Sequence, residues 1–343
     1  MRLPWRAALG LALTVALLWL ALRGTDWTKL WSALQSSSLA LWALAVVVSQ
    51  LIYPLRARRW RPILTPVAPN VSFGPMWRAT AIGLMVTTLV PARVGELARA
   101  YALAREEPRV PFAAGLASLF VDRVFDAVVV LILIVVALLD PHFTSAMTVT
   151  FHGTSKSLGA LVAVATAGTV GVLAVLSVVV YAPASAERMA ARLARTVVPR
   201  WEPAVVGIAR KFIEGLAVLR RPALLVATFA WAMAHWVTSA ASIWIAFRAL
   251  SIDVPITAAF FVQGLLAIGA AAFPTQGFFG VFELAGLAGL SVYGVDRDTA
   301  LAWALTYHVL TLIPITLFGL WYVGKAGLSF GEIRQTRAQA PAQ

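Results

Sequence analysis

Residues 127–139 read AVVVLILIVVALL and contain no polar side chain. Extended back to residue 112, this run is long enough to cross the roughly 30 Å hydrocarbon core of a bilayer as a helix. Trp or Tyr stands at the ends of several similar runs, as is common at membrane interfaces. The complete set of expected full spans is 7–22, 39–55, 112–139, 158–181, 223–249 and 300–323. The sequence therefore predicts an all-α polytopic membrane protein.

The composition agrees with a membrane protein and excludes several other classes. Of 343 residues, 60% are hydrophobic and 13% are charged, whereas soluble domains carry about 25% charged residues. The net charge of +13 comes from Arg-rich loops between apolar runs. This pattern indicates the positive-inside bias of membrane proteins and attraction to anionic lipids. It does not indicate binding of nucleic acid. The chain lacks cysteine, and no other spacing of ligand residues suggests a metal site, so we expect neither metal nor cofactor.

Two apolar runs are too short to cross and are interrupted by Pro and Gly. Residues 77–90 would span about 21 Å as a helix, and the apolar pattern resumes at 97–104. Residues 257–273 are followed in the same way by 284–293. Each pair predicts a re-entrant helical hairpin, because Pro ends helices and Gly allows sharp turns. The expected breaks are at Pro91, Gly95, Pro274, Gly277 and Gly280.

The loop charges predict the orientation of the chain. The loops around 56–61 and 182–222 are rich in Arg, whereas 140–157 and 251–256 carry few charges. If both hairpins enter and leave on one side, the basic loops and both termini lie in the cytoplasm. We therefore expect a protein of the cytoplasmic (inner) membrane, with an uncleaved first helix and a disordered cytoplasmic tail at 326–343.

The expected elements repeat within one membrane domain, 1–343. The order span, span, hairpin, span occurs in 1–140 and again in 158–325. Because the first half makes three crossings, the second half starts on the opposite side, as in an inverted repeat. Coincidence is the alternative, because any apolar chain can be divided into similar halves. Broken helices at matching positions indicate a transporter's binding site.

Charged residues lie around the first break and at the start of the following span. Arg93, Glu96 and Arg99 recur every three residues and share one face of a helix. Asp122, Arg123 and Asp126 precede the run at 127–139. Charges near a bilayer centre cost about 2.5–3.5 kcal/mol each, so they require partners. We expect Arg93 and Arg99 to pair with the carboxylates, in a structural ion network, a substrate site or both. An ordinary cytoplasmic loop is the alternative for the first group.

The second break ends at Glu283, in an apolar region without a basic neighbour in the sequence. This carboxyl group either stays protonated or finds a partner in space, and Arg93 and Arg99 are the candidates. A buried acid in a membrane protein indicates a functional site. His235 and His308 lie in spans, where we expect them to form hydrogen bonds with neighbouring helices.

Three motifs carry a family resemblance: PARVGELARAYAL at 91–103, Asp-Arg-x-x-Asp at 122–126, and PTQGFFGVFE at 274–283. With them the chain resembles, over nearly its whole length, the lysylphosphatidylglycerol synthase transmembrane regions, or flippase-like domain proteins. One departure is Gln276-Gly277, where relatives often have two adjacent glycines. The resemblance implies movement of lipids between leaflets. Full-length members also carry a soluble transferase domain, which we do not expect here, because the chain ends about twenty residues after the last span.

Taken together, these features predict a lipid translocase rather than an enzyme, with membrane lipids, anionic or aminoacylated, as partners. No Walker A motif is present, so we do not expect the protein to use ATP hydrolysis as its energy source. Arg93 and Arg99 would contact phosphate, and the carboxylates would hold these arginines or a cationic headgroup. The alternatives are a membrane-embedded lipid-modifying transferase and a non-transporting partner of a lipid-synthesis complex. The expected substrate-binding residues are Arg93, Glu96, Arg99, Asp122, Arg123, Asp126 and Glu283.

Overall fold

The computed structural model describes residues 5–89, 94–143, 221–273 and 275–325, together with Pro183–Val197 and scattered positions between 167 and 207. Pro91, Arg93, Pro274, most of the expected span 158–181 and the tail 326–343 lie outside the described residues. The described residues form helices and no strand. The all-α prediction is therefore confirmed.

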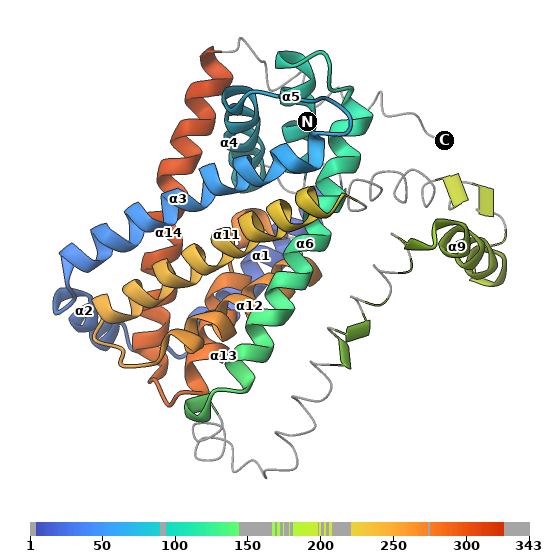
Figure 1. Cartoon of the computed structure of the whole chain (residues 1–343). Coiled ribbons are helices and arrows are strands. Elements are labelled where there is room, and N and C mark those ends of the chain that lie inside the picture. Colours follow the sequence, from blue (N-terminus) through green and yellow to red (C-terminus); the bar gives the residue numbers. More distant parts are fainter. Residues whose placement is uncertain are drawn as a thin grey trace.

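The helices other than α9 pack as a bundle in which segments far apart in the sequence lie side by side (Figure 1). In chain order they are α1 Trp5–Leu22, α2 Trp27–Gln35, α3 Leu39–Leu64, α4 Phe73–Leu89, α5 Gly95–Glu106, α6 Phe112–Leu138, α9 Pro183–Val197, α11 Pro222–Ala249, α12 Ile256–Ala272, the 3-10 turn η3 Gln276–Phe278, α13 Val281–Ser291 and α14 Arg297–Lys325.

Three described helices, α3, α11 and α14, are long and apolar enough to cross a membrane. A fourth span results if α1 and α2 count as one, although they are bent by 83°. The bend is stabilised by Asp26, whose carboxylate accepts hydrogen bonds from the first backbone N–H groups of α2. Helix α6 has 27 residues, but Asp122, Arg123 and Asp126 interrupt its apolar character. The chain is thus a multi-pass helical membrane protein, and the expected six full spans are not confirmed.

Each of the two short apolar runs forms a pair of antiparallel helices. In the first pair, a Cβ atom added to Gly83 of α4 would lie 2.8 Å from the Gly95 carbonyl oxygen of α5. In the second pair, a Cβ atom on Gly269 of α12 would lie 2.7 Å from Val281 of α13, and one on Gly289 would lie 2.6 Å from Val262. The glycines therefore allow the two backbones of each pair to approach closely.

The helix contacts of the first half have counterparts in the second half. Helices α3 and α11 lie along each other in the middle of the bundle (Figure 1). Helix α4 packs on α14, and α12 packs on α6. The contacts α3–α4 and α5–α6 likewise correspond to α11–α12 and α13–α14. The two larger apolar cores of the described residues lie around Trp60 and Met85 and around Phe247 and Trp303, and a smaller one surrounds Phe143.

The ends of the two broken helix pairs meet beside α1. The side-chain amide of Gln276 donates a hydrogen bond to the Leu89 carbonyl at the end of α4, at 2.8 Å. The backbone N–H of Gln276 donates to Thr14 of α1 at 3.0 Å. Gly277 and Gly280 have φ of 56° and 82°, a left-handed conformation that glycine adopts without steric cost. Both glycines lie between α12 and α13, where the break was expected, and Gly95 is the first residue of α5 and packs closely on α4.

Candidate functional site

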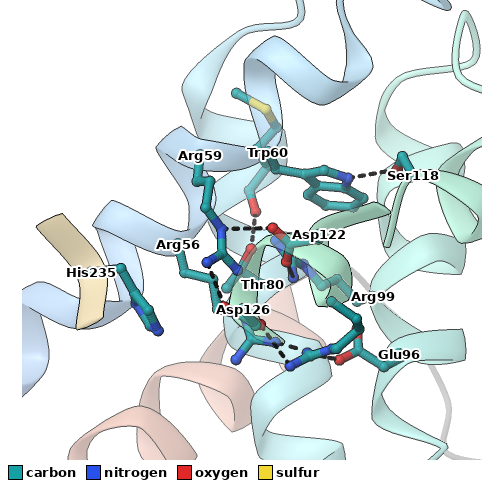
Figure 2. A network of polar contacts seen from close by, with 12 residues as sticks. Arg56, Arg59, Trp60, Thr80, Glu96, Arg99, Ser118, Asp122, Asp126 and His235 are labelled. Atoms are coloured by element: carbon teal, nitrogen blue, oxygen red, sulfur yellow. Dashed lines mark hydrogen bonds and ion pairs between the residues drawn. The ribbon is translucent and has the colours of Figure 1, made fainter. Parts of the chain in front are cut away.

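Two carboxylates in the middle of α6 bind an arginine of α3 (Figure 2). The Nε atom of Arg59 lies 2.6 Å from Asp122 Oδ1, and its Nη1 lies 2.5 Å from Asp126 Oδ1. The side chains of Arg59 and Asp122 are both 0% exposed. Asp122 and Asp126 are one helical turn apart, so both face α3. This triad is the buried centre of the site.

The partner Arg59 was not anticipated, because the sequence placed residues 56–61 in a cytoplasmic loop. The expected loop is wrong: α3 continues to Leu64 and carries these residues along the bundle. Arg56 and Arg59 are three positions apart and face inward, whereas Arg58 and Arg61 are exposed. The spacing of three residues between Arg56 and Arg59 was the sequence feature that could have indicated a continuing helix with both side chains on one face.

Arg99 of α5 reaches the same carboxylate from the other side. Its Nη1 is 3.5 Å from Asp122 Oδ2, which makes an ion pair but no hydrogen bond. Its guanidinium lies over the Trp60 ring, 4.2 Å from the centroid, and Trp60 donates to Ser118 at 2.7 Å. The Arg99 side chain is 3% exposed, yet none of its three nitrogens has a hydrogen-bond partner among the described residues. Unsatisfied buried donors are costly.

The network extends from this buried centre toward a more accessible edge (Figure 2). Arg123 is 44% exposed and pairs with Asp126 at 3.0 Å and also with Glu96. Glu96 additionally contacts Arg56 at 3.4 Å. The indole of Trp236 on α11 donates to Asp126 at 2.7 Å. The network therefore links α3, α5, α6 and α11.

The described members of this network carry one more positive than negative charge. The cations are Arg56, Arg59, Arg99 and Arg123, and the anions are Glu96, Asp122 and Asp126. The members that are at most 9% exposed, Arg59, Arg99, Asp122 and Asp126, balance in charge, so the excess lies in the more accessible part of the network. The free N–H donors of Arg99 favour an anion that can accept several hydrogen bonds. Five of the seven expected binding residues therefore lie together, and Arg93 lies outside the described residues.

Glu283 belongs to a separate centre. Its Oε1 lies 2.8 Å from His308 Nδ1 of α14, and its Oε2 accepts a hydrogen bond from Gly280 N at 2.6 Å. His308 Nε2 lies 2.9 Å from the Gly277 carbonyl. The partner is thus a histidine, and the expected pairing with Arg99 is not seen. His308 and His235, which contacts the Ile52 carbonyl at 3.2 Å, both bond neighbouring elements as expected.

Comparison with known proteins places these centres in a family. The family described as "Lysylphosphatidylglycerol synthase TM region" matches residues 7–319. The chain belongs to this family. The matched region contains both the Arg59 network and the Glu283–His308 pair. Among curated proteins, the chain is 29% identical over 259 residues to a protein named "Glycosyltransferase AglD" of Haloferax volcanii. That alignment covers 71% of this chain and 41% of the relative, so it spans less than half of the relative's length.

Proposed function

We propose that this lysylphosphatidylglycerol synthase TM region protein is a translocase that moves a phospholipid or glycolipid between the leaflets of the cytoplasmic membrane. The observation that carries the proposal is Arg99, a buried guanidinium without a hydrogen-bond partner among the described residues. A lipid phosphate would supply acceptor oxygens in the geometry that a guanidinium binds best. It would also neutralise the excess positive charge of the network.

The proposed topology has six full spans and two re-entrant hairpins, with both termini in the cytoplasm. Helices α4 and α12 have 17 residues each, about 25 Å, which is short of a core of roughly 30 Å. The matching helix contacts of 1–140 and 158–325 support an inverted repeat. In such repeats, broken helices form the substrate site near the bilayer midplane. Both helix breaks would then face the lipid pathway.

The proposal assigns a role to several residues of the network. Arg99 binds the headgroup phosphate, and the undescribed Arg93 is expected to join it. Asp122 and Asp126 position Arg59 and orient the arginines around the phosphate. The more exposed Glu96 is available to a cationic headgroup, as in an aminoacylated lipid. The acyl chains remain in the bilayer.

We expect Arg99→Gln to lower the rate of lipid movement at least about tenfold, because the change removes about 1.4 kcal/mol or more of headgroup binding in the rate-limiting state. The measurement uses proteoliposomes of phosphatidylethanolamine and phosphatidylglycerol with tail-labelled phosphatidylglycerol. A membrane-impermeant quencher reports how much label reaches the outer leaflet with time.

Arg61→Gln serves as the matched control, since Arg61 is on α3 and its side chain is exposed. The thermal stability of both variants in detergent shows whether Arg99→Gln folds. Equal transport rates for a folded Arg99→Gln and the wild type would contradict the proposed phosphate contact.

A lipid-modifying transferase is the second candidate, and the name of the Haloferax volcanii relative favours it. The two functions differ in what a gene deletion does to the lipids. A transferase deletion removes a covalently modified lipid, whereas a translocase deletion changes the leaflet distribution of an unchanged lipid. Mass spectrometry of total lipids, combined with leaflet-specific labelling, separates them. A non-transporting partner of a lipid-synthesis complex predicts that Arg99→Gln is tolerated.

A further inference from the structure

The Glu283–His308 pair occupies a second buried centre, where η3 and α13 meet α14. The two side chains are 0% and 3% exposed, respectively. Phe282 stacks on the imidazole with ring centroids 4.3 Å apart, and Phe279 lies at 4.6 Å on the same ring. The pair is thus a polar contact enclosed by aromatic rings.

The hydrogen-bond geometry determines how many protons this pair holds. His308 Nε2 faces the Gly277 carbonyl oxygen, which can only accept, so Nε2 carries a hydrogen. The 2.8 Å contact between His308 Nδ1 and Glu283 Oε1 then contains one further proton. Either the carboxyl group donates it to a neutral imidazole, or an imidazolium donates it to a carboxylate. The pair is neutral overall in both cases, which suits a buried site.

Loss or gain of a proton breaks this arrangement. Without the proton, one imidazole hydrogen remains for two acceptors, the Glu283 carboxylate and the Gly277 carbonyl, and a net negative charge is buried. With a second proton, two donors face each other and a net positive charge is buried. Only the state with one proton keeps the bonds of Glu283 to His308 and to Gly280, and that of His308 to Gly277.

Among the described residues, the groups that pack around the pair carry no charge. On α14, Tyr307 contacts Ser242 at 2.8 Å. From α3, Gln50 and Tyr53 point at the Thr311 carbonyl. The facing groups of α1 and α4 are the Thr14 hydroxyl and the Thr88 carbonyl, which do not titrate in water. Within the described part of the chain, His308 is the one residue that forms a salt bridge with Glu283.

We propose that Glu283 and His308 form a binding site for a single proton that drives lipid translocation; the inference rests on the proposed translocase function. The bound proton holds the η3 segment against α14. After this proton is released to water, the remaining imidazole hydrogen moves to Nδ1, where it bonds the Glu283 carboxylate, and the Gly277 carbonyl loses its donor. The η3 segment is then free to leave α14.

The η3 segment connects this proton site to the anion site. Gln276 of η3 bonds to the Leu89 carbonyl at the end of α4. Helix α4 packs closely on α5 through Gly83 and Gly95, and α5 carries Arg99. A movement of η3 therefore reaches Arg99 through two closely packed helices. A site at one helix break can thereby change the affinity for a lipid phosphate at the other.

The experiment imposes a pH difference of about two units, in either direction, across proteoliposomes that contain the full chain and tail-labelled phosphatidylglycerol. We expect the rate of net lipid movement to differ about tenfold between the two directions of the gradient. A protonophore should abolish the difference, and a sodium gradient should not replace the proton gradient. Glu283→Gln keeps an amide donor toward His308 but removes the carboxyl group that shares the proton, so the rate difference between the two gradient directions should disappear. Its thermal stability in detergent shows whether it folds.

Asp253→Asn is the matched control, because Asp253 is a carboxylate with 90% of its side chain exposed. It should respond to the gradient as the wild type does. Wild-type lipid movement that ignores the gradient would overturn the proton site and leave the translocase function intact. A full gradient response in a folded Glu283→Gln would also overturn it. Absence of any lipid movement by the wild type would overturn both proposals.

Discussion

Arg59→Met is expected to lower the free energy of unfolding by about 3–5 kcal/mol, because it leaves buried carboxylates without their cation. Arg59 contacts both Asp122 and Asp126 at 2.6 Å or less, and no part of its side chain is exposed. The remaining cation at Asp122 is Arg99, at 3.5 Å and without a hydrogen bond. Met preserves much of the length of the side chain, so the expected loss comes from the charge.

The measurement is reversible unfolding in mixed detergent micelles, followed by tryptophan fluorescence. Arg61→Met is the control, since this neighbouring side chain is exposed and its loss should change stability by less than about 0.5 kcal/mol. Equal stabilities of the two variants would show that the buried triad does not stabilise the fold.

The triple variant Arg59→Met, Asp122→Asn, Asp126→Asn tests the cause of the effect. It removes the uncompensated carboxylates together with their cation but leaves the buried Arg99 without Asp122, so we expect it to recover only part of the lost stability. If the triple variant is no more stable than Arg59→Met, the loss arises from packing around Arg59 and not from unpaired charge.

The sequence was sufficient to predict features that depend on local chemistry. Gly277 and Gly280 were expected to break the helix, and both have the left-handed conformation that a side chain disfavours. The cost of burying charge in a membrane also required that Asp122 and Asp126 find cations. Arg99 was correctly expected near Asp122 for this reason. These predictions need no knowledge of how distant helices pack.

Features that depend on distant packing were missed. Arg59 stands among four arginines, two of which are exposed, so composition indicated a loop while the helix continued. Only the position of α6 shows which face of this helix turns inward. His308 is 25 residues from Glu283, and nothing local to either residue indicates the other. Local sequence patterns thus indicate which charged residues are buried, whereas their partners depend on how distant helices pack.

Gly95→Ala is expected to reduce lipid movement by at least about tenfold and to cost about 1–3 kcal/mol of stability, because it overpacks the contact between α4 and α5. The added Cβ atom would overlap Thr87 Oγ1 and the Gly83 carbonyl oxygen. The carbonyl belongs to the backbone of α4, so the two helices must separate. Arg99 lies one turn further along α5 and moves with it, away from Asp122 and Trp60. Small displacements of a positioned binding group cause large losses of rate.

Gly324→Ala is the control for this prediction, since an added Cβ atom there would meet nothing within 4 Å. This variant should keep the transport rate and, because Ala favours helix over Gly, should not lose stability. Adding Thr87→Ala to Gly95→Ala removes one of the two overlaps but not that with the carbonyl. The double variant should therefore recover only part of the transport rate. Wild-type rates in Gly95→Ala would show that the close approach of α4 and α5 is not needed to position Arg99.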